Sequence, residues 1–419
     1  WLLEKPIIVV INDTSFVHGG VPPYVADNGL AGINGPLKKE LFDLLVARSE
    51  LEGSAEMNPI DRFKESPAML TERIEAGQLM GAMQAAAENV IALSKSPLHG
   101  PAGPTWYRGT ASCSSLIEGD ELNAALDTIG ASRVVFGHTP TITRQVQQRM
   151  NGRIVEIDTG MLSTHYDGSG NALVIEGGEL AVINQYDRAD LRPIDHPVRV
   201  GHESMAIDDD ELASILANGS IVELNGDAAA WRLVQVTAGE TIVSAYFREL
   251  PKEDHFVPEL AAYKLDRILG LGMVPVTVRR EIDEQQGTLQ FVPADTMTER
   301  ERVADGVGRV TPCPIGKQVR AMYVFDALIG NPARTPSTML FSPDDWLLML
   351  VDHESSFGVE TDRPAYVKEI ELAIGEQWRM ALLEIDDETL ATNLGDVLDE
   401  RRLAALLKRR DAMITDSSR

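Results

Sequence analysis

Residues 6–20 read PIIVVINDTSFVHGG, two runs of mainly β-branched residues interrupted by an Asn-Asp pair. Two such runs on either side of a short turn predict a β-hairpin. The second run ends at His18, which is followed by Gly19 and Gly20. Glycine beside a histidine at a strand end lets a metal or a phosphate approach the backbone, because no Cβ blocks the way. The stretch therefore predicts an α/β domain with a ligand site at a strand end.

A second histidine occupies the same kind of position. His138 follows the apolar run 133–136, with Gly137 before it. Neutral imidazole is a good ligand for Zn, Mn or Fe, so two histidines from separate strand ends would supply half of one metal's ligands. Taken singly, each is better explained as a loop histidine that caps backbone groups, because a His-Gly pair is a weak motif.

Composition sets the broad class of the protein. The chain has 419 residues, enough for two or three domains, and 44% of them are apolar, as in a soluble globular protein. Its net charge of −26 argues against nucleic acid and anionic lipid as partners. No apolar stretch approaches the roughly 18 residues of a membrane span. Cys113 and Cys313 form no CxxC pair, so neither a thiolate zinc site nor a disulfide framework is indicated, and a single bridge stays open without support.

The order of patterns along the chain predicts its domains. Helical spacing covers 37–92, and strand-like runs then alternate with turns as far as Asn184. The segment 188–205 lacks periodicity and contains two prolines, so we expect the domain linker there. Beyond it, a helix and three short strands with hairpin turns predict a small antiparallel sheet, followed by a mostly helical remainder from Lys317.

Four short motifs occur in the first part of the chain, and two of them contain His18 and His138. They are, in order, FVHGG (16–20), WYRG (106–109), GHTP (137–140) and IDTGM (157–161). The series resembles the calcineurin-like metallophosphoesterases, and most of all the bacterial phosphoprotein phosphatases called Shewanella-like. The resemblance covers about 1–187 and implies a β-sandwich flanked by helices. It also implies hydrolysis of a phosphoprotein or a small phosphomonoester at a site with two divalent metal ions, Mn, Fe or Zn.

The resemblance assigns roles to individual residues. His18 and His138 inherit the place of ligands to the second metal. Arg108 would neutralise phosphate oxygens as a bidentate guanidinium, and its alternative role is a surface arginine stacked on Trp106. Asp158 would support the metal-site loop rather than bind metal, in the company of the glycines already named at 19, 20 and 137.

One part of the family pattern is missing from this sequence. The motifs GDxH, GDxxDRG and GNHE, which supply most carboxylate ligands and the catalytic His–Asp pair, do not occur. In the family's order they would precede Trp1, and the chain starts without Met. We therefore expect the back half of a phosphatase, which as given does not hold two metals tightly and is inactive by itself.

The later part of the chain carries a second set of motifs. AYFR (245–248), ELAAYKLDR (259–267), VFDALIGN (324–331) and LVDH (350–353) resemble the atypical kinase fold shared by HipA-type and phosphatidylinositol-kinase-like proteins. The likeness covers about 206–360 and implies a bilobal α+β domain over 206–419. It implies a strand cation paired with a helix glutamate, and an aspartate that binds magnesium.

This sequence departs from the kinase pattern at three positions. Arg248 replaces the strand lysine, Ala333 the catalytic aspartate and Thr338 the metal-binding asparagine, whereas Glu259 and Asp352 are kept. A methyl group cannot deprotonate an acceptor hydroxyl, so the resemblance predicts a pseudokinase. Binding of ATP with magnesium through Arg248, Glu259 and Asp352 stays open.

These observations favour a metal-dependent phosphoesterase with a degenerate kinase-like domain for regulation or targeting. Two alternatives remain: a phospho-ligand or nucleotide binding module without catalysis, and an atypical kinase that uses a displaced carboxylate such as Asp344 or Asp345. The expected partner is a phosphorylated protein or small phosphoester. The sequence leaves the oligomeric state and the compartment undecided, with the cytoplasm slightly favoured and a periplasmic location open.

Overall fold

The computed structural model shows a mixed α/β chain of two compact units. The first comprises 1–111 and 121–193, and the second comprises 112–120 and 194–419. The structure describes residues 2–162, 164–166, 168–184, 188–189, 192–193, 207–223, 231–250, 256–293 and 295–417. The linker predicted at 188–205 begins too early, because 188–189 and 192–193 form short strands of the first unit; the other residues of that range lie outside the described residues. The segment 112–120 belongs to the second unit, although the sequence pattern placed it in the first domain.

A mixed sheet forms the centre of the first unit, with strand order β1-β2-β3-β5-β4-β9. Its strands are β1 (Ile8–Ile11), β2 (Thr14–Val17), β3 (Arg133–Phe136), β4 (Gln147–Arg149), β5 (Ile154–Glu156) and β9 (Arg192–Pro193). β1 and β2 form the predicted antiparallel hairpin. β2, β3 and β5 run parallel, so their carboxyl ends lie at one edge of the sheet.

Alternate side chains of β3 face two different layers, as the two-residue period of a strand requires. Val134 packs in a cluster with residues of the helices α1 (Val25–Gly53) and α5 (Ser115–Ile129). Val135 packs with Val182 in a cluster under a second sheet. That antiparallel sheet consists of β6 (Asn171–Glu176), β7 (Glu179–Asn184) and β8 (Arg188–Ala189). The central sheet therefore has a helical side and a β-sheet side.

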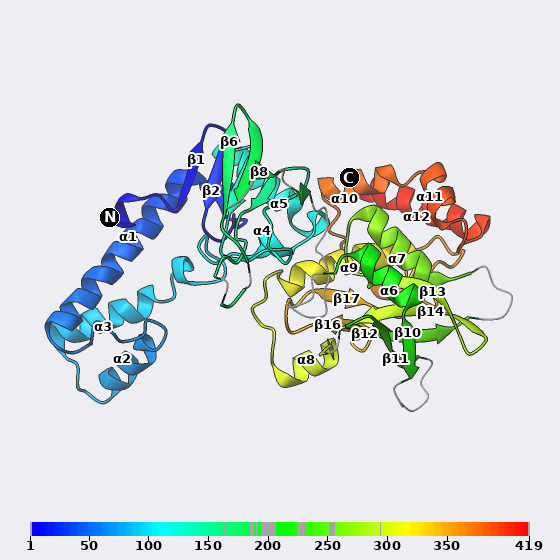
Figure 1. Ribbon diagram of the computed structural model, residues 1–419. Helices are drawn as coiled ribbons and strands as arrows, with labels where there is room; N and C mark the ends of the chain where they lie inside the picture. The colour runs from blue at the N-terminus through cyan, green and yellow to red at the C-terminus, as the bar shows by residue number, and fades with distance from the viewer. Residues whose placement is uncertain are drawn as a thin grey trace. The chain divides into compact units, whose positions relative to one another are not determined.

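A helical insertion extends the first unit, as the spacing over 37–92 predicted (Figure 1). α1 starts at Val25, earlier than that pattern, and continues through Pro36. α2 (Ser66–Glu75) and α3 (Gly81–Leu93) pack against the distal part of α1 around Leu51. Short helices η1 (Leu2–Glu4), η2 (Pro97–His99) and α4 (Gly109–Ser112) complete the helices that begin before residue 112.

The second unit begins with an antiparallel sheet of order β10-β11-β12-β14-β13. Its strands are β10 (Ser220–Glu223), β11 (Arg232–Ala238), β12 (Thr241–Glu249), β13 (Thr277–Ile282) and β14 (Gln285–Val292). α6 (Asp209–Asn218) packs on it through a shared apolar cluster, and α7 (Pro258–Leu269) contacts β13. The helix and the small antiparallel sheet predicted here are confirmed.

The remainder combines helices, a long irregular segment after residue 350 and a small sheet, which the sequence pattern missed. Its strands are β15 (Met297–Thr298), β16 (Met339–Phe341) and β17 (Leu348–Leu350). β16 and β17 are three-residue runs with no exposed side chain, so they show no alternation from which a strand is recognised. The helices are α8 (Glu299–Asp305), α9 (Ile315–Ile329), η3 (Ala365–Val367), α10 (Glu376–Glu384), α11 (Asp387–Leu394) and α12 (Glu400–Ser417).

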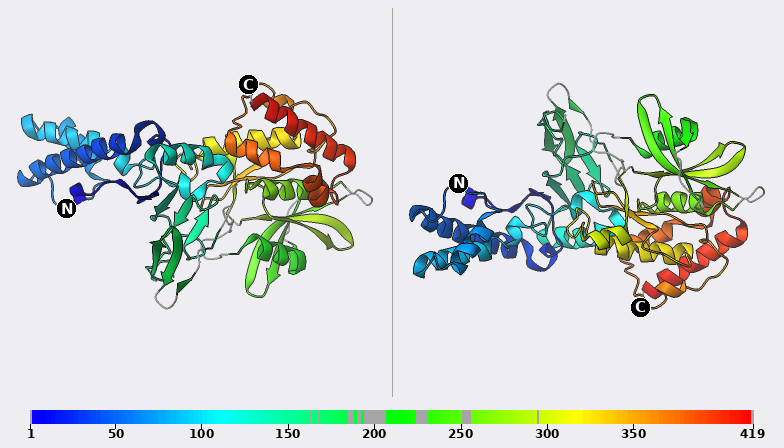
Figure 2. Two further views of the ribbon diagram at one scale, coloured as in Figure 1. Left: turned by 90° about the horizontal axis from the view of Figure 1, so that it is seen from above. Right: turned by 90° about the horizontal axis from the view of Figure 1, so that it is seen from below.

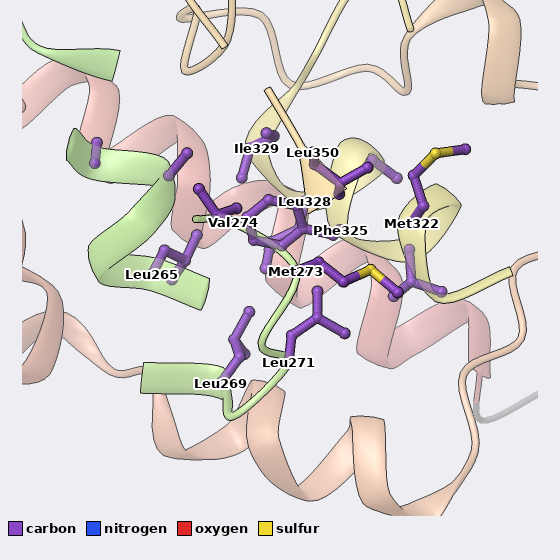
Figure 3. Packing of buried hydrophobic residues seen from close by; sticks show 14 of the residues in the cluster. Leu265, Leu269, Leu271, Met273, Val274, Met322, Phe325, Leu328, Ile329 and Leu350 are labelled. Atoms are coloured by element: carbon purple, nitrogen blue, oxygen red, sulfur yellow. The ribbon is translucent and has the colours of Figure 1, made fainter. Parts of the chain in front are cut away.

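α9 is the central helix of this remainder. Figure 2 shows it beside the red α12, and the two helices are in contact. Phe325 and Leu328 of α9 meet Leu265 of α7 and Leu350 of β17 in the largest apolar cluster (Figure 3). These four side chains are fully buried, so α7, α9 and β17 form one rigid base for the loops that follow them.

The structure bears on two expectations from the sequence, which concern a disulfide bond and a membrane span. A disulfide joins Cys113 to Cys313, with 5.1 Å between their Cα atoms, and this corrects the view that a bridge lacked support. The sequence separation of 200 between the cysteines hides the pairing from any local motif. Among the described helices, none combines the length and the apolar character that crossing a bilayer requires.

Candidate functional site

The two histidines predicted at strand ends lie side by side. β2 and β3 are parallel neighbours, with Phe16 opposite Val135, so His18 and His138 leave the sheet at the same edge. His18 Nε2 lies 3.1 Å from His138 Nδ1. Their ring centroids are 4.8 Å apart and the rings are edge-on. The two rings are close enough to bind one ligand. The role of His18 and His138 as metal ligands stays a prediction.

The glycines after His18 let another segment approach it closely. A Cβ on Gly19 would lie 2.7 Å from the carbonyl carbon of Thr105, and one on Gly20 would lie 2.7 Å from Tyr107 O. The backbone N–H groups of both glycines donate to Pro104 O, at 2.8 and 3.2 Å. The pair Gly19-Gly20 therefore brings the segment that carries Arg108 to the strand end.

Gly137 acts through its backbone. Its N–H donates to His18 O at 3.0 Å, which ties the two strand ends together. A Cβ there would meet Asp158 Cβ only at 3.8 Å, which is ordinary contact. The next residue, His138, has a φ of 67°, a left-handed conformation that a residue with a side chain adopts at a cost.

The surroundings of His138 favour its neutral form. Burial lowers the pKa of His138, the charges of His18 and Arg108 lower it further, and Asp158 opposes them. The ring of Trp106 stands edge-on to His138 at 4.6 Å between centroids. Trp106 is 39% exposed, and Lys64 of the helical insertion lies 5.8 Å from its ring centroid. A neutral ring can act as a ligand or accept a proton.

Three buried polar atoms here have no hydrogen-bond partner among the described residues. They are His138 Nε2, Arg108 Nε and Thr139 Oγ1. Arg108 is half-buried, so it is not simply a surface arginine stacked on Trp106. Buried polar groups are nearly always paired in proteins, so such atoms gathered at one strand end indicate a place for a polar ligand.

Asp158 has a different role from the histidines. Its Oδ1 accepts a hydrogen bond from Gly160 N at 3.0 Å, and its backbone carbonyl accepts one from Thr141 N at 2.8 Å. Gly160 has a φ of 61°, which suits glycine, and Asp158 thus shapes the turn after β5. This agrees with a supporting residue beside the site.

The residues present do not complete the dinuclear metal site that the resemblance implies. Two imidazole nitrogens supply at most half of one metal's ligands. Over the described part of the chain, no group of three or more His, Cys, Asp or Glu side chains is placed to hold a metal ion. No hydrolytic step through metals can be derived from these residues, and what they offer is a pair of nitrogen donors beside an arginine.

A second candidate site joins the three charged residues predicted in the second unit. Arg248 of β12 places Nη1 at 3.1 Å from Glu259 Oε1 of α7 and at 3.1 Å from Asp352 Oδ1 after β17. Its Nη2 contacts Glu354, which the sequence motifs did not mark. The guanidinium lies 5.2 Å from the ring centroid of Trp231. Arg248, Glu259 and Asp352 therefore come together as predicted, with Glu354 added.

Glu259 is held on its other side by His353. Glu259 is buried, and its Oε1 accepts the backbone N–H of His353 at 2.7 Å. Its Oε2 lies 3.1 Å from His353 Nδ1. Burial alone would raise the pKa of Glu259, but the hydrogen bonds and charges of His353 and Arg248 hold it below its ordinary value. The carboxylate is thus ionised inside the protein.

The position of the missing catalytic aspartate lies beside another buried ion pair. Arg334 donates from Nε and Nη2 to Asp326 of α9 at 2.9 and 2.7 Å. Asp326 also accepts from Asn331 Nδ2 at 2.9 Å and Tyr366 Oη at 2.6 Å. Ala333 sits exposed in the same loop. This network fixes the loop but offers no base at position 333.

The remaining predicted positions lie in the segments on either side of β16. Thr338 exchanges hydrogen bonds with Thr335, its Oγ1 donating to the carbonyl at 3.1 Å. Asp344 and Asp345 lie in the turn between β16 and β17, where Asp345 accepts the backbone N–H of Leu347 at 2.8 Å. A displaced catalytic carboxylate at 345 would first have to release that turn.

Sequence reasoning missed Asp326, Arg334 and Glu354. One signal was present: Asp326 interrupts the apolar run 324–329, and an acidic residue within a buried helix face needs a partner. Glu354 gave no signal, because its contact with Arg248 depends on the path of the loop after β17.

Comparison with known proteins gives distant likenesses. No family model matches the chain, and no curated protein matches it. Among solved structures, the Helicobacter pylori proinflammatory kinase CtkA aligns with 48% of this chain and 93% of its own, at 13% identity and a TM-score of 0.34. The FAT and kinase domain of CtTel1 aligns with 90% of this chain and 30% of its own, at 12% identity and a TM-score of 0.24. At these scores neither likeness determines the fold of either unit.

Proposed function

We propose that the first unit belongs to a phosphoesterase and recognises the phosphate group of a phosphoprotein or small phosphomonoester. The observation that carries the proposal is the approach of His18 to His138 within 3.1 Å at one strand end. Nitrogen donors and a guanidinium are the groups that hold a phosphate or a metal–phosphate complex. Hydrolysis by two divalent ions, Mn, Fe or Zn, is the activity expected from the sequence motifs, and His18 and His138 would be two of the metal ligands.

Arg108 supports the same proposal. Its Nε is buried without a partner in the described part of the chain, and its charge reaches His138. A guanidinium presents several donors in one plane, which matches two oxygens of a phosphate. Trp106, standing at the rim, adds an apolar surface for the group that carries the phosphate.

A binding module without catalysis is the second candidate for this unit. It is favoured by the incomplete set of metal ligands in the described residues. The two candidates share recognition of phosphate and differ in turnover. One experiment therefore measures both properties on the same chain.

The test combines inorganic phosphate binding, followed by calorimetry, with hydrolysis of p-nitrophenyl phosphate in the presence and absence of Mn²⁺. His138→Ala should weaken phosphate binding and remove any Mn²⁺-dependent turnover. His165→Ala is the matched control, because His165 is an exposed histidine of the same unit that contacts Tyr166. Mn²⁺-dependent turnover that His138→Ala removes selects the phosphoesterase. Phosphate binding without turnover fits the binding module and equally a phosphoesterase that lacks carboxylate ligands. Unchanged binding in His138→Ala would refute both candidates.

For the second unit we propose a kinase-like domain that does not transfer phosphate and serves regulation or targeting. Ala333 and Thr338 stand where a base and a metal ligand are needed, and Arg248 already contacts Asp352. The test is incubation of the whole chain with γ-labelled ATP and Mg²⁺, beside an Asp352→Ala variant. Incorporation of label that disappears in the variant would overturn the proposal and favour an atypical kinase.

A further inference from the structure

Three separate parts of the second unit meet at one arginine. Arg248 comes from β12, Glu259 from the first turn of α7, and Asp352 with Glu354 from the loop after β17. The arginine side chain is 13% exposed, whereas those of Asp352 and Glu354 are 36% and 57% exposed. The ion cluster thus has a buried inner side at Glu259 and an outer side open to solvent.

The charges in this cluster are unequal. One guanidinium faces three carboxylates. Its Nη1 contacts both Glu259 and Asp352, and its Nη2 contacts Glu354. Without Arg248 the buried Glu259 would keep, among the described residues, the hydrogen bonds with His353. Removing one partner of a buried ion pair leaves an uncompensated charge, which is strongly unfavourable. Among the described residues, Arg248 is thus the cation that joins the loop carboxylates Asp352 and Glu354 to β12.

The backbone of the loop after β17 has conformations that depend on contacts to hold them in place. Asp352 has a φ of 64° and Phe357 a φ of 61°, two left-handed residues that are not glycine. Such conformations persist where the surrounding contacts determine them. Phe357 N donates to Ile329 O at 2.7 Å, and the Arg248 contact fixes Asp352 at the other end.

Holding carboxylates from two elements in one place is the task that a bound divalent cation performs in many proteins. We propose that Arg248 is a built-in substitute for such a cation. Its guanidinium occupies the positive position among Glu259, Asp352 and Glu354, keeps the loop after β17 in place without metal, and excludes Mg²⁺ from this position.

This inference rests on the proposed absence of phosphate transfer in the second unit, but it makes its own claim. It concerns which cation neutralises the carboxylates, whereas the labelling experiment concerns chemistry. A chain that transfers no phosphate and still binds Mg²⁺ at Asp352 would contradict the inference alone. A chain that transfers phosphate would contradict the proposed function.

The test is titration of the whole chain with Mg²⁺, followed by calorimetry and by the melting temperature. Mg²⁺ is chosen because it prefers carboxylate oxygens to imidazole, so the histidines of the first unit contribute little. Arg248→Ala should melt at a lower temperature and regain part of the loss with Mg²⁺. Its affinity for Mg²⁺ should exceed that of the unaltered chain at least about tenfold, which is about 1.4 kcal/mol.

Two further variants identify the site. Arg248→Ala combined with Asp352→Asn should lose the gained Mg²⁺ affinity, because the outer carboxylate is gone. Arg279→Ala is the matched control, since Arg279 belongs to the same sheet and donates to the backbone carbonyl of Asp396 at 3.0 Å. It should gain no Mg²⁺ affinity.

Arg248→Lys keeps the test decisive if Arg248→Ala does not fold. A lysine carries one nitrogen and cannot bridge three carboxylates, so this variant should gain some Mg²⁺ affinity and lose less stability. The inference is overturned if the unaltered chain binds Mg²⁺ as tightly as the arginine variants, or if Asp352→Asn lowers Mg²⁺ affinity in the unaltered chain.

Discussion

The two candidate sites differ in how their polar groups are satisfied. At the strand ends of the first unit, His138 Nε2 and Arg108 Nε are buried and lack partners among the described residues. In the second unit, the charged groups are paired, because Glu259, Asp352 and Glu354 all contact Arg248; His353 Nε2 beside them is the buried ring atom without a partner among the described residues. Unpaired buried donors are costly and are retained where a ligand pairs them, whereas paired charges hold a fold together. The two proposals differ accordingly: a phosphate ligand at the first site, and Arg248 in place of a divalent cation at the second.

The largest expected effect comes from breaking a pair in the second unit. Asp326→Ala leaves Arg334, whose side chain is 1% exposed, without its carboxylate. The free energy of unfolding of the second unit should fall by about 3–5 kcal/mol, as for other broken buried ion pairs. Urea unfolding measures it. Asp326→Leu combined with Arg334→Met, which removes both charges, should recover part of the loss; a further loss would contradict the buried-charge explanation.

The disulfide should contribute the next largest effect. Cys113→Ser removes the bond to Cys313 and should lower the free energy of unfolding by about 2–4 kcal/mol, because the unfolded chain is no longer cross-linked. Cys313→Ser should give the same loss, and the double variant no more. Reduced unaltered chain should behave like either variant. Equal stability of the oxidised and reduced chains would show that the bond does not form.

Acid should weaken the second unit through Asp326. Burial alone would raise the pKa of Asp326, but the charge of Arg334, with hydrogen bonds from Arg334, Tyr366 and Asn331, holds it below its ordinary value. Below a pH of about 4 the unfolded chain takes up the proton first, so stability is lost as the pH falls toward the lower folded pKa. Asp326→Asn should have a shallower loss over this range in urea unfolding curves recorded at several pH values.

The smallest expected effect concerns Arg108 in the first unit, whose Nε lacks a partner among the described residues. Arg108→Lys keeps the charge but removes the planar fork, so phosphate affinity should fall about tenfold, or about 1.4 kcal/mol. The melting temperature should stay nearly the same, because Arg108 Nε has no partner to lose in the described part of the chain. Unaltered phosphate binding together with a lower melting temperature would make Arg108 a packing residue beside Trp106.

Local sequence signals predicted the elements and, in part, the sites. The hairpin of β1 and β2 follows from its β-branched runs. The glycines after His18 were predicted to admit a metal or a phosphate, but the backbone of Thr105 and Tyr107 takes the space beside them. The meeting of His18 with His138 depends on the parallel pairing of β2 and β3, which periodicity does not reveal. The contact of Glu354 with Arg248 and the disulfide could not be predicted for the same reason: the paired residues are 106 and 200 positions apart in the sequence.

The bond between Cys113 and Cys313 has a consequence for handling the protein. Its sulfurs close a covalent ring that contains the whole segment between them, a separation of 200 residues. A protease that cuts once anywhere in that ring opens it without releasing a fragment. The two pieces should migrate together on a gel run without reductant and separate only after a thiol is added, so an intact band from such a gel is no proof of an intact chain.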